Sequence, residues 1–342
     1  MNNEIGVSIP GKIVISGEYA VLYGALAILT TLNQKANVKI QANDQNQNIY
    51  LTSALEGVFP FDTDEDANII WLEADPGAYG LLLQHAFKIL KPILKEKLSI
   101  TVDSSEFFHT TKDRTAKKLG IGSSAAVSVG ITQALFQYQK IVSSPGNLLT
   151  QANTIHQTLQ DKQGSGIDVA CCFANQGVIE CTKDSVKSHT WSILNWPNGL
   201  HLKVLTTGQG ASTKKLVTNY KKASNLYPKE FKNALEQFMD ITQNLSNAWR
   251  AENIDQIIDL LTAYDVQIKK LDKIGDIGIY TQLHTEVQNI ASGYNLFYKP
   301  SGAGGGDIGL VFSPSLDELN DFSDEISKVA GNIGYLDLTM GC

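Results

Sequence analysis

The chain has 342 residues, 43% of them hydrophobic, so it is long enough to bury a sizeable core in about two domains. Its net charge of -7 and pI near 5.4 exclude a surface built mainly for nucleic acid or anionic membrane, because such surfaces carry a basic excess. An anionic ligand would have to be met by a local cluster of positive groups.

The N-terminal half begins with strand patterns. Segments rich in Ile and Val occupy about residues 5–15, 37–42 and 98–103, which predicts three β-strands. A helix is predicted over 124–139, because apolar side chains at 127, 131, 135 and 136 share one face, and Ser123 and Ser124 suit its N-terminus. A second helix over 146–160 precedes the polar loop DKQGSG.

The second half mixes strands with long amphipathic helices. The turn residues NWPNG at 195–199 predict a boundary between two domains, 1–195 and 196–342. Strands and helices without strict βαβ alternation favour an α+β fold. Strand patterns lie near 177–192, 200–206 and 308–312, and helical patterns lie at 228–248, 253–271 and 278–292.

The rest of the composition gives further expectations. The start MNNEIGVSIPGK resembles no signal peptide and no long apolar run occurs, so we expect a soluble, cytoplasmic protein with no membrane or nucleic-acid partner. The four cysteines form no CxxC pair, which predicts reduced, mostly buried thiols. The six histidines are scattered along the chain and none belongs to an HExxH motif, which disfavours a transition-metal site.

The first glycine-bearing segment is SIPGKIVISGEYAVLYG. Gly6 to Lys12 nearly spells a P-loop, but Ile13 stands where the magnesium-binding Ser or Thr is required, and Pro10 removes one backbone amide. What remains is Lys12 on a tight turn that leads into an apolar strand. Lys12 is then either a ligand-facing cation or a solvated surface lysine.

The second segment is KKLGIGSSAAV at 117–127. It fits the loose G-x-G-x-x-[GA] form, but no acidic residue follows about 20 positions later, so dinucleotide binding is weakly supported. Glycines and a helix N-terminus also suit a phosphate, with Ser hydroxyls for phosphate or Mg²⁺. A plain helix cap is the simpler alternative.

Two further loops carry glycines. KPSGAGGGDIGLVF at 299–312 has a glycine run at a strand entrance, which indicates either a close backbone approach to a ligand or a bulged turn. QGSGIDVACC at 163–172 places Asp168 after a Gly-Ser-Gly turn, where it is either a helix cap or a positioned carboxylate.

Taken in order, these segments resemble the signature motifs of the galactokinase, homoserine kinase, mevalonate kinase and phosphomevalonate kinase (GHMP kinase) superfamily. PGKIVISGEYAV is similar to its first motif, LGIGSSAAV to the ATP-binding second motif and SGAGGGDIGL to the third. The resemblance implies a two-domain α+β fold. It comprises a ribosomal protein S5 domain 2-like N-terminal domain and a ferredoxin-like C-terminal domain, with the active site between them.

Within the superfamily, the chain is most similar to phosphomevalonate kinases. SGAGGGD, HQTLQDKQGSGIDVA and TGQGASTKKLV each resemble their patterns, although Thr206 replaces a tryptophan. EYAVLYGALAI resembles mevalonate kinases, which usually carry His where Tyr19 stands and an acidic metal ligand where Gln157 stands. The implied activity is ATP-dependent phosphorylation of 5-phosphomevalonate to 5-diphosphomevalonate in the mevalonate route to isoprenoids. Mevalonate kinase and a non-catalytic ligand-binding regulator are the alternatives, and a homodimer stays open.

The resemblance also implies a site, with ATP and Mg²⁺ as cofactors. The catalytic positions are Lys12, Lys118 and Asp168, and Ser124 is the metal ligand. The nucleotide positions are Gly120, Ile121, Gly122, Ser123, Ser124 and Ala125. The acceptor positions are Ser16, Glu18, Tyr19, Ser165, Gly166, Ser212, Thr213, Ser301, Gly302, Ala303 and Gly304.

Overall fold

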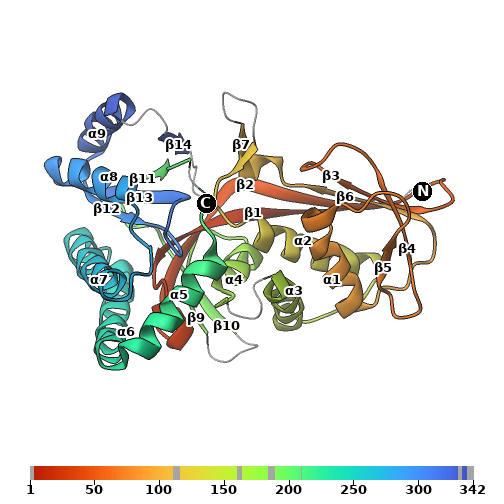
Figure 1. Cartoon of the computed structure of the whole chain (residues 1–342), viewed down its shortest axis with the longest axis horizontal. Coiled ribbons are helices and arrows are strands. Elements are labelled where there is room, and N and C mark those ends of the chain that lie inside the picture. Colours follow the sequence, from red (N-terminus) through yellow and green to blue (C-terminus); the bar gives the residue numbers. More distant parts are fainter. Residues whose placement is uncertain are drawn as a thin grey trace.

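The computed structural model describes residues 4–110, 116–159, 164–183, 189–208, 210–329 and 333–336. Two sheets stand side by side along the long axis of the molecule, and each is covered by helices (Figure 1).

The larger sheet belongs to the N-terminal part of the chain. Its strands are β1 (Ile5–Ser16), β2 (Ala27–Ala42), β3 (Asn48–Thr52), β4 (Phe59–Thr63), β5 (Ile69–Trp71), β6 (Leu98–Asp103), β9 (Val178–Lys183) and β10 (His189–Leu194). They follow the order β10-β9-β2-β6-β3-β4-β5, and β1 pairs with β2. Only the pairing of β3 with β6 is parallel among the described strands of this sheet.

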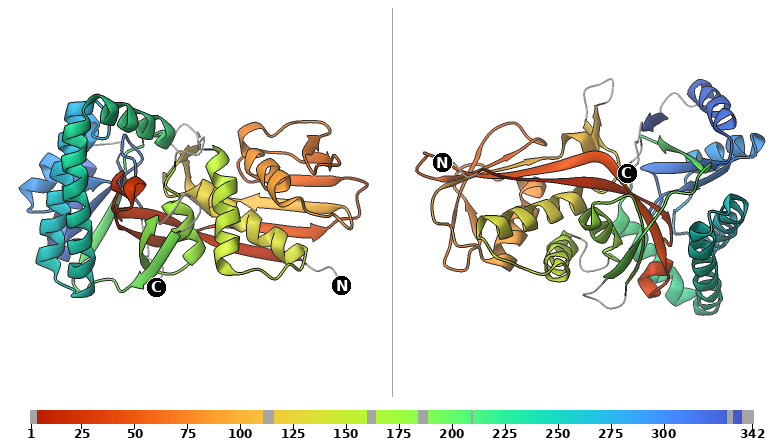
Figure 2. Two further views of the ribbon diagram at one scale, coloured as in Figure 1. Left: turned by 90° about the horizontal axis from the view of Figure 1, so that it is seen from below. Right: turned by 180° about the vertical axis from the view of Figure 1, so that it is seen from behind.

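Four helices pack beside this sheet, mostly on one face (Figure 2). They are α1 (Leu81–Leu90), α2 (Ser123–Tyr138), α3 (Pro145–Leu159) and α4 (Ile167–Ala174). Helix α2 approaches the strands closely, because a Cβ on Gly130 would lie 2.7 Å from Cγ2 of Val38 in β2. The remaining N-terminal elements are the 3₁₀ turns η1 (Ala20–Tyr23), η2 (Gly77–Tyr79) and η3 (Ser105–Phe107) and the hairpin of β7 (Phe108–Thr110) and β8 (Ala116–Lys118).

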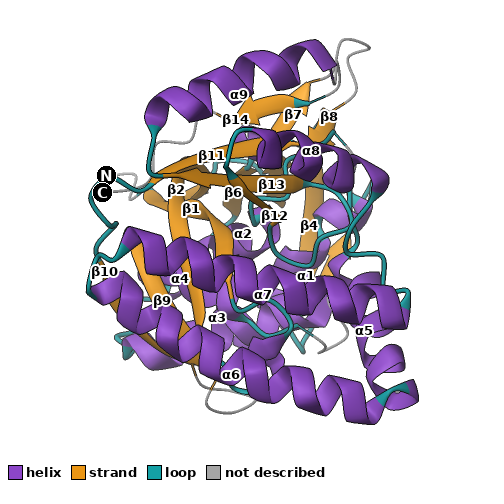
Figure 3. Cartoon of the chain, turned by 90° about the vertical axis from the view of Figure 1, so that its left-hand side faces the viewer, coloured by secondary structure: helices purple, strands orange, loops and turns teal. Residues whose placement is uncertain are grey.

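The C-terminal part contains a four-stranded sheet and five helices. The strands β11 (His201–Thr206), β12 (Phe297–Pro300), β13 (Ile308–Ser313) and β14 (Gly334–Leu336) follow the order β12-β13-β11-β14. The helices are α5 (Thr213–Leu226), α6 (Pro228–Arg250), α7 (Ile254–Gly275), α8 (Gln282–Gly293) and α9 (Leu316–Val329). Helices α6 and α7 pack side by side as a long pair (Figure 3).

The hydrophobic core crosses the predicted domain boundary. Trp249 in α6 and Phe312 in β13 belong to the same buried cluster as Ile13 in β1. The segment 195–200 connects β10 and β11, which lie in different sheets. The division into 1–195 and 196–342 remains a proposal.

The structure confirms the α+β fold class and most predicted elements. Strand β2 is longer than predicted, since it begins at Ala27 rather than near residue 37. Helix α8 begins at Gln282 rather than near 278, because the backbone N–H groups of Gly278, Ile279 and Tyr280 all bond to Asp272 instead of entering a helix.

Other expectations concern cysteines and membrane helices. Cys171, Cys172 and Cys181 are buried thiols that form no disulfide within the described residues, and Cys342 lies outside those residues. Among the described residues, no helix combines the length and apolarity needed to cross a membrane.

Candidate functional site

One cavity brings together three of the four glycine-bearing segments singled out in the sequence, whereas the second segment, with Lys118 and residues 120–125, contributes none of its lining residues. It is lined by Lys12, Val14, Glu18, Tyr19, Val21, Leu22, Gly164, Ser165, Ile167, Asp168, Thr213, Val217, Gly302 and Ala303. Eight predicted site residues are therefore in its wall: Lys12, Glu18, Tyr19, Ser165, Asp168, Thr213, Gly302 and Ala303. The residues from β1, the α4 loop, α5 and the third glycine run are far apart in the sequence.

The second glycine segment forms a turn in front of α2. Gly120 and Gly122 have φ of +75° and +90°, a region that glycine enters without steric cost. Gly122 is the residue before α2, and having no side chain it cannot cap the helix. No side chain of this residue caps the first-turn amides, and the N-terminus of a helix with open amides and a positive dipole end is the kind of place where proteins bind anions. Ser123 and Ser124 begin the helix but are not its cap.

Lys12 lies directly against this turn. Its backbone N–H donates to the carbonyl of Ile121 at 2.8 Å, and a Cβ on Gly122 would lie 2.9 Å from Cε of Lys12. Any side chain larger than hydrogen at position 122 would therefore displace the lysine. This contact places the cation of the first segment beside the glycine turn of the second.

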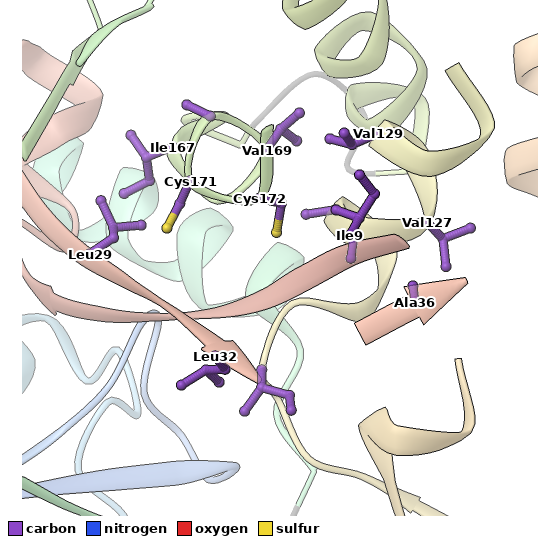
Figure 4. Close-up of a cluster of buried hydrophobic side chains, with 14 of the residues drawn as sticks. Ile9, Leu29, Leu32, Ala36, Val127, Val129, Ile167, Val169, Cys171 and Cys172 are labelled. Atoms are coloured by element: carbon purple, nitrogen blue, oxygen red, sulfur yellow. The ribbon is translucent and has the colours of Figure 1, made fainter. Parts of the chain in front are cut away.

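Helix α4 positions Asp168. The apolar side chains Ile167, Val169, Cys171 and Cys172 are buried around α4, beside the strands (Figure 4). Asp168 is about one-fifth exposed, and its Oδ1 accepts a hydrogen bond from the N–H of Val169 at 2.9 Å. Since the residue before α4 is Gly166, Asp168 is a positioned carboxylate in the first turn rather than the N-cap.

A third side chain connects Asp168 to the α2 turn. His156 in α3 is buried, and its Nε2 lies 3.1 Å from Oγ of Ser124 and 3.8 Å from Oδ2 of Asp168. Burial lowers the pKa of His156; Asp168 opposes this shift, and Lys118 and Lys12 reinforce it. The imidazole is therefore neutral near pH 7.

The charge state of Asp168 follows from the same surroundings. Burial raises its pKa, whereas His156, Lys12 and the N–H of Val169 lower it, and the net direction is downward. Because His156 is neutral, we attribute the shift mainly to Lys12 and the backbone donor. Asp168 is ionised and faces two lysines.

Lys118 ends β8, is exposed, and is not part of the cavity wall. Partial desolvation lowers its pKa, with Asp307 and Asp168 opposing that shift and Lys12 reinforcing it. A Cβ placed on Gly120 would lie 2.5 Å from the Cβ of Asp307, so Asp307 lies directly against the α2 turn. Lys12, Lys118, Asp168 and Asp307 thus form one group of interacting charges.

The structure places several predicted acceptor residues in supporting contacts. Oγ of Ser301 accepts from the N–H of Val14 at 3.2 Å and donates to the carbonyl of Val14 at 2.8 Å, so Ser301 holds the third segment against β1. Ser16 is buried and does not line the cavity, and its Oγ has no partner among the described residues. Ser212 caps α5 by accepting from the N–H of Lys215 at 3.3 Å.

Tyr19 and Glu18 join the cavity to the C-terminal part. The hydroxyl of Tyr19 donates to the carbonyl of Ala303 at 2.5 Å, and its ring stacks on Tyr220 with centroids 4.6 Å apart. Glu18 forms a buried ion pair with Lys299 of β12. Both residues line the cavity and also connect the two halves of the chain. Gly166 and Gly304 lie outside the cavity wall.

The donors at the α2 turn suit a magnesium ion bound to nucleotide phosphates. Mg²⁺ prefers oxygen ligands, usually one or two from the protein with the rest from phosphates and water. Ser124 offers a hydroxyl and Asp168 an ionised carboxylate, joined through His156. Within the part of the chain that is described, no three His, Cys, Asp or Glu side chains gather as a metal cluster.

Sequence reasoning missed two residues of this site. His156 appears within the segment that resembles phosphomevalonate kinases, but a single histidine on an amphipathic helix does not reveal which neighbours it faces. Asp307 stands in the third motif, and its carboxyl accepts from the N–H of Ala211 at 3.1 Å, which ties the β13 entrance to the residues before α5. Only the tertiary contact shows this connection.

Comparison with known proteins identifies the family of the N-terminal part of the chain. Residues 82–176 match the family described as GHMP kinases N terminal domain. The chain therefore carries a GHMP kinase N-terminal domain, and the family predicted from the motifs is confirmed.

Individual relatives point to the phosphomevalonate branch. The chain is 25% identical over 338 residues to a phosphomevalonate kinase of Streptomyces sp. (strain CL190), with 88% of each chain covered. It is 26% identical over 157 residues to a mevalonate kinase of Saccharolobus solfataricus, covering 46% of this chain and 45% of the relative. A crystal structure of Streptococcus pneumoniae phosphomevalonate kinase with phosphomevalonate and AMPPNP superposes with a TM-score of 0.78, 19% identity and coverage of 98% and 99%.

Proposed function

We propose that this chain is an ATP-dependent kinase that phosphorylates 5-phosphomevalonate to 5-diphosphomevalonate. The observation that carries the proposal is the approach of these groups to one another: Lys12 and Asp168 line one cavity, Lys12 lies against the α2 turn, and Lys118 interacts electrostatically with Lys12 and Asp168. Similarity to a phosphomevalonate kinase along most of both chains supports the choice of acceptor. A location in the cytoplasm and assembly as a homodimer stay predictions.

Phosphoryl transfer requires mainly positioning and charge neutralisation. In the proposed reaction, the amides at residues 122–125 hold the nucleotide phosphates, and Lys12 and Lys118 draw the two anionic substrates together. The pairing of Lys12 with the α2 turn and with Asp168 fixes where that positive charge lies. Such fixed charges cost no reorganisation during the reaction.

The proposed cation site consists of Ser124 with phosphate oxygens. Bound Mg²⁺ would neutralise phosphate charge there. Ser124 presents its Oγ at the start of α2, and Gln157 occupies the position where mevalonate kinases have an acidic ligand. In our proposal Asp168, whose Oδ2 lies 3.8 Å from Nε2 of His156, supplies the acidic group near this cation site.

The chemistry of the acceptor decides how much Asp168 contributes. The second pKa of a phosphomonoester is about 6, so the acceptor is already mostly a dianion and a nucleophile at pH 7. Asp168 then acts by orienting Lys12 and the acceptor. With an alcohol acceptor such as mevalonate, Asp168 would also take a proton.

Mevalonate kinase is the second candidate, supported by the shorter match to the Saccharolobus solfataricus mevalonate kinase. Tyr19 and Gln157 count against it, because mevalonate kinases usually carry other residues at those positions. A non-catalytic regulator of the same fold is disfavoured, since Lys12 and Asp168 both line the cavity.

A coupled ADP-release assay tests the proposal. Mevalonate, 5-phosphomevalonate, homoserine and galactose are offered separately with saturating ATP and Mg²⁺. We expect turnover with 5-phosphomevalonate to exceed that with the other three acceptors. Turnover with mevalonate alone would identify mevalonate as the acceptor in place of 5-phosphomevalonate. ATP binding without turnover of any of the four acceptors would favour a non-catalytic regulator.

The pH profile of Asp168→Asn provides a second test. The dianionic acceptor becomes a monoanion below pH about 6, so the wild-type rate should fall there. The variant should have a lower rate at every pH but keep this acidic limb, because the limb belongs to the acceptor. Disappearance of the limb in the variant would assign it to the Asp168 carboxyl and favour an alcohol acceptor.

A further inference from the structure

His156 occupies a position that the proposed mechanism has not used. It lies in α3, is 1% exposed, and directs Nε2 toward both Oγ of Ser124 and Oδ2 of Asp168. Its other ring nitrogen, Nδ1, is buried and has no hydrogen-bond partner among the described residues. A buried imidazole with one nitrogen engaged and one bare is not explained by apolar packing.

The contacts of His156 determine its tautomer. If Nδ1 carried the proton, the lone pair on Nε2 would face Oδ2 of the ionised Asp168, which only accepts hydrogen bonds. The proton on Nδ1 would also be a buried donor without an acceptor. With the proton on Nε2, the ring donates toward Ser124 and Asp168, and Nδ1 keeps an unused lone pair. The neutral Nε2–H form therefore satisfies the most groups.

We propose that His156 is a positioning residue that orients the hydroxyl of Ser124 for a nucleotide-bound Mg²⁺ and steadies Asp168. This inference rests on the proposed function through the role of Ser124. When Oγ of Ser124 accepts from Nε2–H, one lone pair is taken, one remains for a cation, and its own O–H is left for a phosphate oxygen. Residues that orient metal ligands in this way typically change metal affinity or activity 10- to 100-fold when replaced.

Substitutions that imitate one ring nitrogen at a time test the role. His156→Gln places an amide N–H near the position of Nε2, His156→Asn places one nearer Nδ1, and His156→Leu keeps volume without a donor. ATP binding to each protein is measured by calorimetry with and without Mg²⁺. We expect His156→Asn and His156→Leu to weaken Mg²⁺-dependent ATP binding about 10-fold. Metal-free ATP binding should change little, and His156→Gln should stay close to wild type.

Equal weakening in all three variants, or no weakening in His156→Leu, would overturn the inference and leave His156 as a packing residue. Thermal unfolding of each variant identifies a folding defect, and if His156→Leu does not fold, the comparison of Gln with Asn still decides. The readout is independent of the acceptor. If wild type fails with every acceptor but the His156 variants differ in Mg²⁺-dependent ATP binding as expected, only the proposed function is refuted. If wild type is active but the three variants bind ATP and Mg²⁺ identically, only this inference is refuted.

Discussion

Two adjacent lysines illustrate how the structure separates residues that the sequence lists together. Nζ of Lys117 donates to the carbonyl of Gly208 at 3.1 Å, so Lys117 holds the loop before α5. Lys118, its neighbour in β8, instead interacts electrostatically with Asp307, Lys12 and Asp168. Strand alternation explains the difference, since successive side chains point to opposite sides.

Lys118→Ala should lower kcat about 10²- to 10³-fold, the usual effect of removing one preorganised charge-stabilising donor. Lys117→Ala is the matched control and should lower kcat far less, because Lys117 contacts the backbone carbonyl of Gly208 and not the charges that surround Lys118. Steady-state turnover with ATP and 5-phosphomevalonate provides the comparison. Near-normal kcat in Lys118→Ala would show that Lys118 is a solvated neighbour.

A buried histidine next to the third glycine run makes stability depend on pH. Nδ1 of His284 lies 2.6 Å from the hydroxyl of Tyr298, and Nε2 lies 3.2 Å from the carbonyl of Gly306. Because that carbonyl only accepts, Nε2 carries the proton and the ring is neutral. Burial lowers the pKa of His284 to about 4; the bond to Gly306 opposes this shift, and Lys299 adds to it.

Below pH 6.5 the unfolded chain therefore binds a proton that folded His284 does not bind until pH about 4. Above pH 6.5 neither state binds this proton, and His284 does not reduce stability. As pH falls from 6.5 to about 4, proton binding by the unfolded chain lowers the free energy of unfolding by up to about 3 kcal/mol. His284→Gln keeps a donor for Gly306 but does not titrate. Urea unfolding at several pH values should show a shallower acid dependence in this variant than in wild type.

His156 shifts stability in the same direction, so the difference between wild type and His284→Gln is the relevant quantity. Identical acid dependence in the two proteins would contradict the assignment.

At the site, the sequence could predict reactive residues inside recognisable motifs, but it could not predict residues that connect one motif to another. Lys12 and Asp168 stand in recognisable glycine-bearing segments, and the structure places both in one cavity. Asp307 and His156 act through contacts between elements distant in the sequence, and no spacing along the chain records such contacts.

At the scale of elements, a single carboxylate shapes the connection between α7 and α8. Asp272 accepts from the N–H groups of Gly278, Ile279 and Tyr280 at 2.8, 2.9 and 2.8 Å. The carbonyl of Ile279 in turn accepts from the N–H of Gly305 at 2.8 Å. Asp272 therefore supports the conformation of the third glycine run from outside the cavity.

Asp272→Ala should reduce the free energy of unfolding by about 3 kcal/mol, because three backbone donors lose a partly buried charged acceptor. Asp276→Asn, four residues further along, is the control: Asp276 is exposed and has a positive φ of 45° that Asn tolerates. Denaturant unfolding monitored by circular dichroism measures both. A loss in Asp272→Ala no larger than in the control would mean that water replaces the carboxylate.

Element predictions succeeded where periodicity was strong. Helices α6 and α7 have continuous amphipathic patterns, and the sequence predicts both within a few residues. It missed β3, β4 and β5, three short strands of three to five residues each. The first half of β2 was also missed, because the polar run Asn33-Gln34-Lys35 interrupts its apolar pattern although β1 pairs along it.

At the scale of the whole molecule, contacts between the first and third segments join the two sheets. Ser301 bonds to Val14 of β1, the hydroxyl of Tyr19 bonds to Ala303, and the hydroxyl of Tyr264 in α7 donates to the carbonyl of Glu18 at 2.6 Å. Because these bonds and the shared hydrophobic core link the two halves, we expect the halves to unfold together.

A further buried connection is the ion pair of Glu18 with Lys299, whose side chains are 6% and 4% exposed. Removing one partner of a buried pair leaves an uncompensated charge and typically costs about 3–5 kcal/mol, whereas replacing both with apolar groups is often close to neutral. Glu18→Leu and Lys299→Met should each destabilise the protein by that amount, and the double variant should be more stable than either single variant.

Differential scanning calorimetry of the four proteins tests both the pair and the coupling. Because the pair joins β12 to the loop after β1 and the core is continuous, each single substitution should move one cooperative transition as a whole. The double variant exchanges the carboxylate of Glu18 in the cavity wall for an apolar group, so its stability can recover while acceptor KM rises. Splitting into two transitions, with only one shifted, would show that residues 1–195 and 196–342 unfold independently. A double variant as unstable as the sum of the single ones would show that Glu18 and Lys299 do not compensate each other.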